Sequence, residues 1–400
     1  MSARLADRDW LGGAAWLGAS GLASALSLLV LASNRLPGLG AAEVTPMLLA
    51  IQWHFVGLTL AKFGIDYALF AIVSRNRGAT FRARTALSFP MLPCVAAFFA
   101  ASLALFTPAQ AAILAAAVFA DTLSAFRQSE FNAKRHFSTS AAGAFLNYPV
   151  FVLLWWLLAR GGTSLTEALA AFAISSALRF AWFEARHAAL SRGATPVQLT
   201  VKGLIGAQGA LNMLLFRSDQ LALAVMHFML LGALALDPML AAYVFLARVP
   251  ELATGLIVLM GTLFFPTHHL EPARPAAALR FYAWPALAAA AGGAIGMAVL
   301  VPTFAGPHPS LAWCAPFAAS IPLILLANLA TYSMQSANCL PGLIRNLAIS
   351  CAAGAAFIAL AALQGSLLLL AWSVPVQLAI FFALAVAAPW GRTVASFRDA

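Results

Sequence analysis

Three pairs of oppositely charged residues lie inside apolar stretches of the sequence. The pairs are Lys62 with Asp66, Arg217 with Asp219, and Arg248 with Glu251. A charged side chain at the centre of a bilayer is costly unless it meets an opposite charge, water or a ligand. The Lys and Arg residues have the chemistry to bind an anionic group, and the carboxylates can hold those cations in place or take up protons.

Spacing decides which of these charges can neutralise each other. Lys62 and Asp66 are four residues apart, so on a helix they are neighbours and form either a self-satisfied pair or part of a water-filled cavity. Arg217 and Asp219 are two apart and point to nearly opposite faces of a helix. Each therefore needs a partner on another span, an interface or a cavity, and Lys62 and Asp66 are candidate partners.

Pro250 stands between Arg248 and Glu251, inside an apolar run. Proline leaves a backbone carbonyl free and tends to bend a helix. Such bends are tolerated in a membrane where protein or a water-filled cavity satisfies the backbone. Pro250 is therefore a hinge candidate, although a simple packing kink explains the same residue equally well.

The remaining polar residues within spans indicate interfaces, not a metal or catalytic site. Asp121, Arg179 and Lys202 are expected to reach the membrane surface. His268 and His269 are adjacent, and the sequence around them lacks the spacing of metal ligands. Since the sequence also lacks a nucleotide-binding motif and a nucleophile motif, we expect no catalytic residue, no metal and no resident cofactor.

The composition is that of a membrane protein. Hydrophobic residues make up 62% of the 400 residues, charged residues 9%, and the mean hydropathy is +0.89. A soluble protein of this size cannot bury that much apolar surface in one core, so the solvent is the lipid bilayer. The net charge of +10 comes from Lys and Arg in short segments between apolar runs, without interleaved aromatics. Nucleic acid is therefore not an expected partner.

A spanning helix needs about 20 mostly apolar residues, and on that measure the sequence predicts twelve spans. They cover roughly residues 10–33, 47–73, 87–106, 109–126, 139–159, 165–184, 199–231, 239–265, 281–301, 312–334, 343–363 and 367–390. A linker near residues 190–196 divides them into two six-helix bundles, 1–192 and 193–400. The second span of each half carries a cation followed one turn later by a carboxylate, which indicates a repeated build.

Loop charges predict the orientation of the chain. The basic segments Ser74–Arg84, Phe126–His136 and Glu184–Gly193, and the C-terminal tail, fall on the same side as Arg4 and Arg8. Loops on the other side are short and nearly uncharged. Because basic loops stay in the cytoplasm, both termini are expected to be cytoplasmic.

Three segments resemble spans of the polysaccharide flippases of the MOP superfamily. They are "LAKFGIDYALFAIVSRNRG" at 60–78, "NMLLFRSDQLALAV" at 212–225 and "AAYVFLARVPELATGLIVLMGTLFFP" at 241–266. The resemblance implies an all-α polytopic membrane protein, with about twelve transmembrane helices in two six-helix bundles around a central cavity, as in MATE-like exporters. It implies alternating access and, residue by residue, makes Asp66, Arg217, Asp219 and Arg248 candidates for that cavity.

The same resemblance implies a substrate and a location. The substrate is a polyprenyl-diphosphate-linked saccharide, moved across the bacterial cytoplasmic (inner) membrane for assembly of surface polysaccharide such as lipopolysaccharide or exopolysaccharide. A polysaccharide polymerase and chain-length machinery are the implied partners beside the lipid bilayer. Lys62, Arg217 and Arg248 would face the diphosphate, and Asp66, Asp219 and Glu251 would hold these cations or couple to protons.

Two other functions remain open on sequence grounds. An exporter of small molecules, including drugs, on the same fold would use Asp66 or Asp219 to couple transport to H⁺ or Na⁺. A membrane-embedded glycan polymerase is the weaker alternative, because such enzymes generally need charged residues in a sizeable outer loop and the outer loops here are short. We therefore expect a transporter and not an enzyme.

Overall fold

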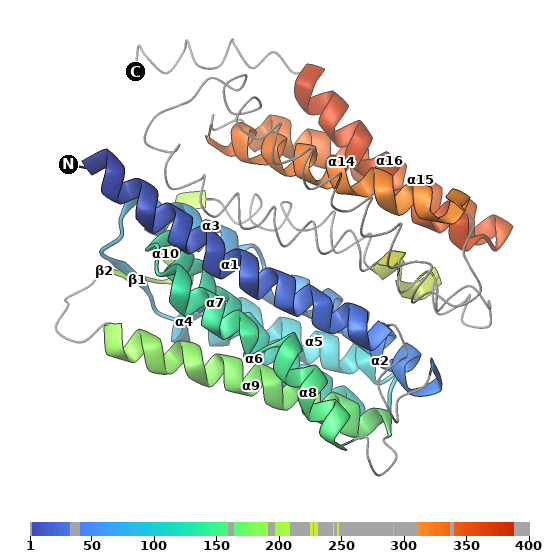
Figure 1. Cartoon of the computed structure of the whole chain (residues 1–400), viewed down its shortest axis with the longest axis horizontal. Helices are drawn as coiled ribbons and strands as arrows, with labels where there is room; N and C mark the ends of the chain where they lie inside the picture. The colour runs from blue at the N-terminus through green and yellow to red at the C-terminus, as the bar shows by residue number, and fades with distance from the viewer. Residues whose placement is uncertain are drawn as a thin grey trace. The chain divides into compact units, whose positions relative to one another are not determined.

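A computed structural model describes residues 2–32, 41–158, 164–190, 197–208, 311–336 and 340–387, with helical fragments at 225–226, 228–230, 243, 246–247 and 291. The chain divides into two compact units, Met1–Ala224 and Val225–Ala400 (Figure 1). The boundary expected between residues 192 and 193 stays a prediction.

The first unit consists of helices and two short strands. In chain order its elements are α1 Ser2–Ala32, α2 Ala41–Lys62, α3 Ile65–Arg75, β1 Ala79–Phe81, α4 Arg84–Ala86, the π-helical turn η1 Leu87–Met91, α5 Leu92–Ser102, α6 Pro108–Ala133, α7 Phe137–Phe145, α8 Tyr148–Leu158, α9 Leu165–Leu190, β2 Val197–Leu199 and α10 Val201–Gln208.

Helix α6 is the centre of this unit, and it packs against α2, α3, α5, α7 and α9. Its start is fixed locally by Thr107, whose Oγ1 accepts a hydrogen bond from the backbone N–H of Gln110 while the Thr107 N–H donates to Oε1 of Gln110. Pro108 occupies the first helical position, where its missing N–H costs nothing. The capping box and proline therefore set where the most buried helix of the unit begins.

Several predicted spans are broken where the sequence pattern indicated one helix. The span expected at 47–73 is interrupted because Phe63 (φ 49°) and Gly64 (φ 71°) are both left-handed. Glycine adopts that conformation freely, whereas phenylalanine does so at a cost. The span expected at 87–106 is interrupted at Phe89, whose backbone is extended, and α7 and α8 replace the one expected at 139–159.

The two strands are the part of the fold that the all-α prediction missed. β1 and β2 pair in parallel, with Ala79 opposite Val197 and Phe81 opposite Leu199. Strands of three residues are too short to show an alternating pattern, so nothing in the hydropathy of either segment indicated them. Figure 1 shows the pair at one end of the first unit, and we call this end the strand end.

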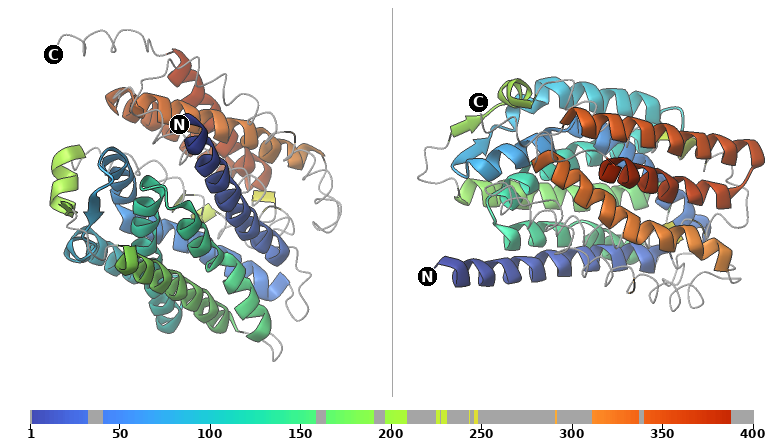
Figure 2. Two further views of the ribbon diagram at one scale, coloured as in Figure 1. Left: turned by 60° about the vertical axis from the view of Figure 1, so that its left-hand side comes forward. Right: turned by 90° about the horizontal axis from the view of Figure 1, so that it is seen from above.

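The described part of the second unit is a packed group of three helices, α14 Leu311–Ser336, α15 Leu340–Gln364 and α16 Leu367–Ala387 (Figure 2). α16 packs against both of the others. α15 and α16 confirm the spans predicted at 343–363 and 367–390, and α14 confirms a helix at 312–334. Most of the three spans predicted between residues 199 and 301 lies outside the described residues.

The chain is a multi-pass membrane protein. Among the described residues, seven helical segments are long and apolar enough to cross a membrane. They are Val44–Lys62, Arg84–Ser102, Pro108–Ala133, Phe137–Leu158, Leu165–Leu190, Gly342–Gln364 and Leu367–Ala387.

Two adjacent glycines in α1 give a matched test of the packing between α1 and α7. A Cβ at Gly13 would lie 2.2 Å from Cδ2 of Phe137, whereas a Cβ at Gly12 would meet nothing within 4 Å. We expect Gly13→Ala to destabilise the protein by about 1–3 kcal/mol through overpacking. Gly12→Ala should be neutral or stabilising by up to about 1 kcal/mol, since Ala is the better helix former. Thermal unfolding in detergent checks both, and equal melting temperatures for the two variants would contradict the packing described.

Candidate functional site

The first unit holds two clusters of charged side chains, both built on α6 and α9. One, the Asp121 cluster, consists of His54, Asp121, Gln128, Ser176 and Arg179. The other, the Arg127 cluster, consists of Thr80, Phe81, Arg127, Glu130, Lys134, Glu184 and His187. The first lies near the middle of α6 and α9, and the second, which includes Thr80 and Phe81 of strand β1, lies at the strand end.

Asp121 receives contacts from two other helices. Oγ of Ser176 donates a hydrogen bond of 2.9 Å to Oδ2, and Nη1 of Arg179 donates one of 3.3 Å to Oδ1. Nε2 of His54, on α2, lies 3.2 Å from Oδ2. A carboxylate, a guanidinium and an imidazole thus meet inside the bundle of α2, α6 and α9.

The cluster is almost completely buried. His54 and Asp121 are each only 1% exposed. Apart from the 3.2 Å contact of Nε2 with Asp121, the ring nitrogens of His54 have no polar partner in the described part of the chain, and the ring packs edge-on against Phe172 at 4.8 Å. The Asp121 carboxylate and the Arg179 guanidinium balance each other's charge, and any added proton leaves the cluster with a net positive charge. In a low-dielectric interior such a change is expensive, so it favours a rearrangement that lets the charge be shared or hydrated.

Arg179 is held by more than Asp121. Its Nη2 donates a short hydrogen bond to Oε1 of Gln128, and its guanidinium lies 5.7 Å from the centre of the Phe183 ring. The expectation that Asp121 and Arg179 reach the membrane surface is therefore wrong. Each points toward the neighbouring helix, and hydropathy alone does not tell which face of a span a charge occupies.

His54 is not among the predicted site residues, all of which except Pro250 carry a formal charge. The signal was present, since a histidine inside the apolar run "AIQWHFVGL" is as unusual in a span as a lysine. Its partner could not be found in the same way, because Asp121 lies on another helix 67 residues further along the chain.

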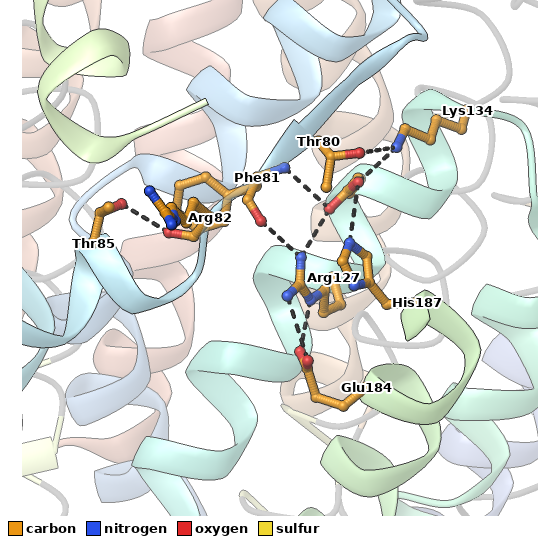
Figure 3. Close-up of polar contacts among 9 residues, drawn as sticks. Thr80, Phe81, Arg82, Thr85, Arg127, Lys134, Glu184 and His187 are labelled. Atoms are coloured by element: carbon orange, nitrogen blue, oxygen red, sulfur yellow. Dashed lines mark hydrogen bonds and ion pairs between the residues drawn. The ribbon is translucent and has the colours of Figure 1, made fainter. Parts of the chain in front are cut away.

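Arg127 is the centre of the second cluster (Figure 3). Its Nε donates a 2.6 Å hydrogen bond to Oε1 of Glu184, and its Nη2 donates a longer one of 3.4 Å to Oε2. Its Nη1 donates to the backbone carbonyl of Phe81 at 2.9 Å and to Oε2 of Glu130 at 3.1 Å. One guanidinium therefore ties α6 to α9 and to strand β1.

The carboxylate of Glu130 accepts from further donors of the cluster. Lys134 donates to its Oε1 at 2.6 Å and also to Oγ1 of Thr80 at 3.0 Å. The backbone N–H of Phe81 donates to Oε2 at 3.4 Å, and Nε2 of His187 lies 3.7 Å from Oε1. Glu130 is 1% exposed, so these cations and N–H groups are what make its burial tolerable.

The position of this cluster corrects the predicted loop Phe126–His136. The structure continues α6 through Ala133, and Arg127 and Glu130 are buried in it. His136 follows outside the candidate spans, where partial burial lowers its pKa and Lys134 lowers it further, against the opposing effect of Glu130. His136 is therefore neutral at pH 7.

Of the predicted site residues, the structure describes one pair. Nζ of Lys62 lies 3.5 Å from Oδ2 of Asp66, with the lysine at the end of α2 and the aspartate in the first turn of α3. The two therefore meet across the Phe63–Gly64 break. Their assignment to a substrate cavity stays a prediction. The other predicted residues lie outside the described residues and are Arg217, Asp219, Arg248, Pro250 and Glu251.

Similarity to solved structures defines the fold. No protein-family model and no curated protein matches the chain. The eukaryotic MATE transporter AtDTX14 superposes with a TM-score of 0.69 at 14% identity, covering 98% of each chain. A multidrug resistance MATE family transporter of the MOP superfamily, in an outward-facing conformation, superposes with a TM-score of 0.58 at 14% identity, covering 97% of each.

A third solved structure is a MOP superfamily transporter from Pyrococcus furiosus, with a TM-score of 0.60 at 14% identity, covering 97% of this chain and 96% of that one. For that protein, a reverse polarity of the binding pocket suggests a different function.

The chain is thus a multi-pass, mainly helical membrane protein. Its fold is that of the MATE transporters, which confirms the predicted fold class and is consistent with twelve helices.

Proposed function

We propose that this protein is a proton-coupled exporter that works by alternating access. The observation that carries the proposal is the Asp121 cluster, a fully buried carboxylate with a histidine and an arginine inside the bundle of a MATE-fold protein. Buried ionisable groups in transmembrane segments are costly, and they mark proton relays and ion pathways in pumps and transporters. MATE-fold proteins solved to date that resemble this chain include a multidrug resistance transporter, which supports the exporter class.

In the proposed cycle one proton binds between Nε2 of His54 and Oδ2 of Asp121. Without it, the Asp121 carboxylate holds Arg179 and so holds α6 against α9. When the proton is bound, the carboxylate attracts Arg179 less strongly. The cluster then carries a positive charge, which is unfavourable in the buried interior of the bundle of α2, α6 and α9. The proton thereby biases the equilibrium between two arrangements of the first unit, which is what coupling to transport requires.

The proposal is tested in everted membrane vesicles that carry the protein. An imposed pH gradient should drive accumulation of a cationic dye such as ethidium, and collapse of the gradient with a protonophore should abolish it. A matched sodium gradient at constant pH should not substitute for the proton gradient. Dye transport that follows Na⁺ and ignores the pH gradient would overturn the proton coupling.

A lipid-linked oligosaccharide flippase is the second candidate. It is favoured by the Lys62–Asp66 contact and by Arg217 and Arg248, two cations within predicted spans that would face a diphosphate. In that case the protein would lie in the inner membrane of a bacterium, with cytoplasmic termini and with a polysaccharide polymerase and chain-length machinery as partners. The Pyrococcus furiosus transporter, for which the reverse polarity of the binding pocket suggests a different function, supports the idea that this fold serves more than one function.

A deletion strain separates the two candidates. Its lipid-linked glycans are extracted while its surface polysaccharide is assayed in parallel. Accumulated lipid-linked repeat units together with lost surface polymer would favour the flippase and reveal the glycan. Unchanged glycans in a strain without a second flippase, together with dye sensitivity, would favour the small-molecule exporter.

Two neighbouring serines in α9 offer a matched test of the Asp121 cluster. Ser176 donates to Asp121, whereas the equally buried Ser175 donates to the carbonyl of Phe172 in its own helix. Ser176→Ala removes a donor that favours the ionised carboxylate, so the half-maximal pH of transport should move up by about one unit. Ser175→Ala should leave the pH profile unchanged. Identical pH profiles of transport for the two variants would show that Asp121 takes no part in the coupling.

A further inference from the structure

A cavity of about 380 Å³ lies at the strand end of the first unit, beside the Arg127 cluster. Three guanidinium groups line it, those of Arg82, Arg84 and Arg127, against the single carboxylate of Glu184. With His187 neutral, the charged side chains of the lining therefore carry a net charge of +2. A hollow surface of one sign concentrates the field and attracts ligands of the opposite charge.

The cations of the lining are not equivalent. Arg127 is buried and already bound to Glu184, Glu130 and the Phe81 carbonyl. Arg82 and Arg84 are exposed, and neither guanidinium makes a hydrogen bond or ion pair with any residue that the structure describes. Two cations at the cavity are thus available for a ligand, while the third is part of the wall.

The backbone holds these two arginines at the cavity mouth. The N–H of Arg82 donates to the carbonyl of Leu199 at 2.8 Å, which continues the pairing of β1 with β2. The carbonyl of Arg82 accepts a hydrogen bond of 2.8 Å from Oγ1 of Thr85. Arg84 begins the next helix. Because both ends of this short connection are fixed, the arginines are presented from an ordered backbone.

The depth and size of the cavity limit the kind of ligand that it can bind. The candidate span Arg84–Ser102 begins at the cavity and the span Leu165–Leu190 ends close to it, so the cavity lies near the level of the lipid headgroups. Its volume is at the lower end of the range for ligand sites, roughly 300–1,000 Å³. A small anionic group fits these limits better than a drug-sized molecule does.

We infer that this cavity binds a phosphate group through Arg82 and Arg84. Guanidinium groups match the geometry of phosphate oxygens and bind them with two parallel hydrogen bonds. Basic pockets between transmembrane helices are also sites for phosphate headgroups. The phosphate belongs to an acidic phospholipid or to a small soluble anion. This site is distinct from the Asp121 cluster, so the inference does not depend on the proposed function.

Binding is measured with the purified full chain in a neutral detergent. Dioctanoyl phosphatidylglycerol is titrated, and occupancy is read by native mass spectrometry with dioctanoyl phosphatidylcholine as the uncharged reference. Arg82→Gln/Arg84→Gln should weaken phosphatidylglycerol binding by about ten-fold or more, because charge-assisted hydrogen bonds are lost. The matched control is Arg77→Gln/Arg186→Gln, which removes the same charge from exposed arginines that do not line the cavity. It should change the affinity by less than about two-fold.

Inorganic phosphate distinguishes the source of the phosphate group. If millimolar phosphate displaces phosphatidylglycerol from the wild type, and Arg82→Gln/Arg84→Gln weakens both ligands, the site is assigned to a soluble phosphate compound. If phosphate has no effect while phosphatidylglycerol still binds through Arg82 and Arg84, the site is assigned to the lipid. Equal losses in the two double variants, or equal binding of phosphatidylglycerol and phosphatidylcholine by the wild type, would overturn the inference. Melting temperatures close to that of the wild type confirm that both variants are folded.

Discussion

Asp121→Asn is expected to leave the protein in the membrane at normal levels and to abolish the response of transport to a pH gradient. Asparagine keeps the size of the side chain and can still accept from Ser176, but it cannot take up the proton or balance Arg179. Coupling free energies between linked sites typically correspond to about 5- to 150-fold. We therefore expect pH-driven dye transport to fall by at least about ten-fold in everted vesicles.

Two further variants distinguish coupling from loss of structure. His54→Gln removes the other proton acceptor and should give the same uncoupled behaviour. Glu167→Gln makes the same kind of change at an exposed carboxylate of α9 that accepts from the Ser164 N–H at 2.8 Å, and transport should be retained. If Asp121→Asn keeps a wild-type pH dependence, Asp121 is only a packing residue. A transport defect shared with Glu167→Gln would point the same way.

Arg127→Leu is expected to cause the largest loss of stability among single substitutions at the strand end. The change removes the ion-pair partner of Glu184. It also leaves Glu130, which is 1% exposed, with Lys134 as its remaining close cation. Removing one partner of a buried ion pair typically costs about 3–5 kcal/mol. Since Glu184 is partly exposed and Lys134 remains, we expect a cost near the lower end of that range, about 3 kcal/mol, seen as a lower melting temperature in detergent.

The controls for Arg127→Leu lie on the neighbouring helix. Arg186 lies on α9, as Glu184 does, and its exposed guanidinium stacks over the ring of Trp182 at 4.5 Å. Arg186→Leu should therefore lower the free energy of unfolding by less than about 1 kcal/mol. The double variant Arg127→Leu/Glu184→Leu should recover part of the loss, because it removes a stranded carboxylate. If Arg127→Leu melts like Arg186→Leu, the Arg127 cluster does not hold α6, α9 and β1 together.

The approximate positions of the described spans could be predicted because length and hydropathy are local properties. The helices α14, α15 and α16 follow the predicted spans within a few residues at each end. The breaks were harder to predict. A single glycine at Gly64 does not by itself announce a left-handed turn, and Phe63 beside it gives no such signal at all.

The sites were less predictable than the spans, because their partners are distant in the sequence. Lys62 and Asp66 could be paired from their spacing, and they lie 3.5 Å apart. The partners of Asp121 on α2 and α9 depend on how three helices turn toward one another, which no local pattern encodes. Arg127 is placed by a backbone carbonyl of Phe81, an acceptor that is independent of side-chain identity.

The pairing of β1 with β2 has a consequence for the synthesis of the protein. Val201 donates to Thr85 across 116 residues of chain, and Leu199 accepts from Arg82 beside it. The segment from residue 79 to residue 85 must therefore wait, through insertion of α5 to α9, until the second strand has left the ribosome. Until then Phe81 lacks its strand partner, and the nascent chain exposes a basic, unpaired segment.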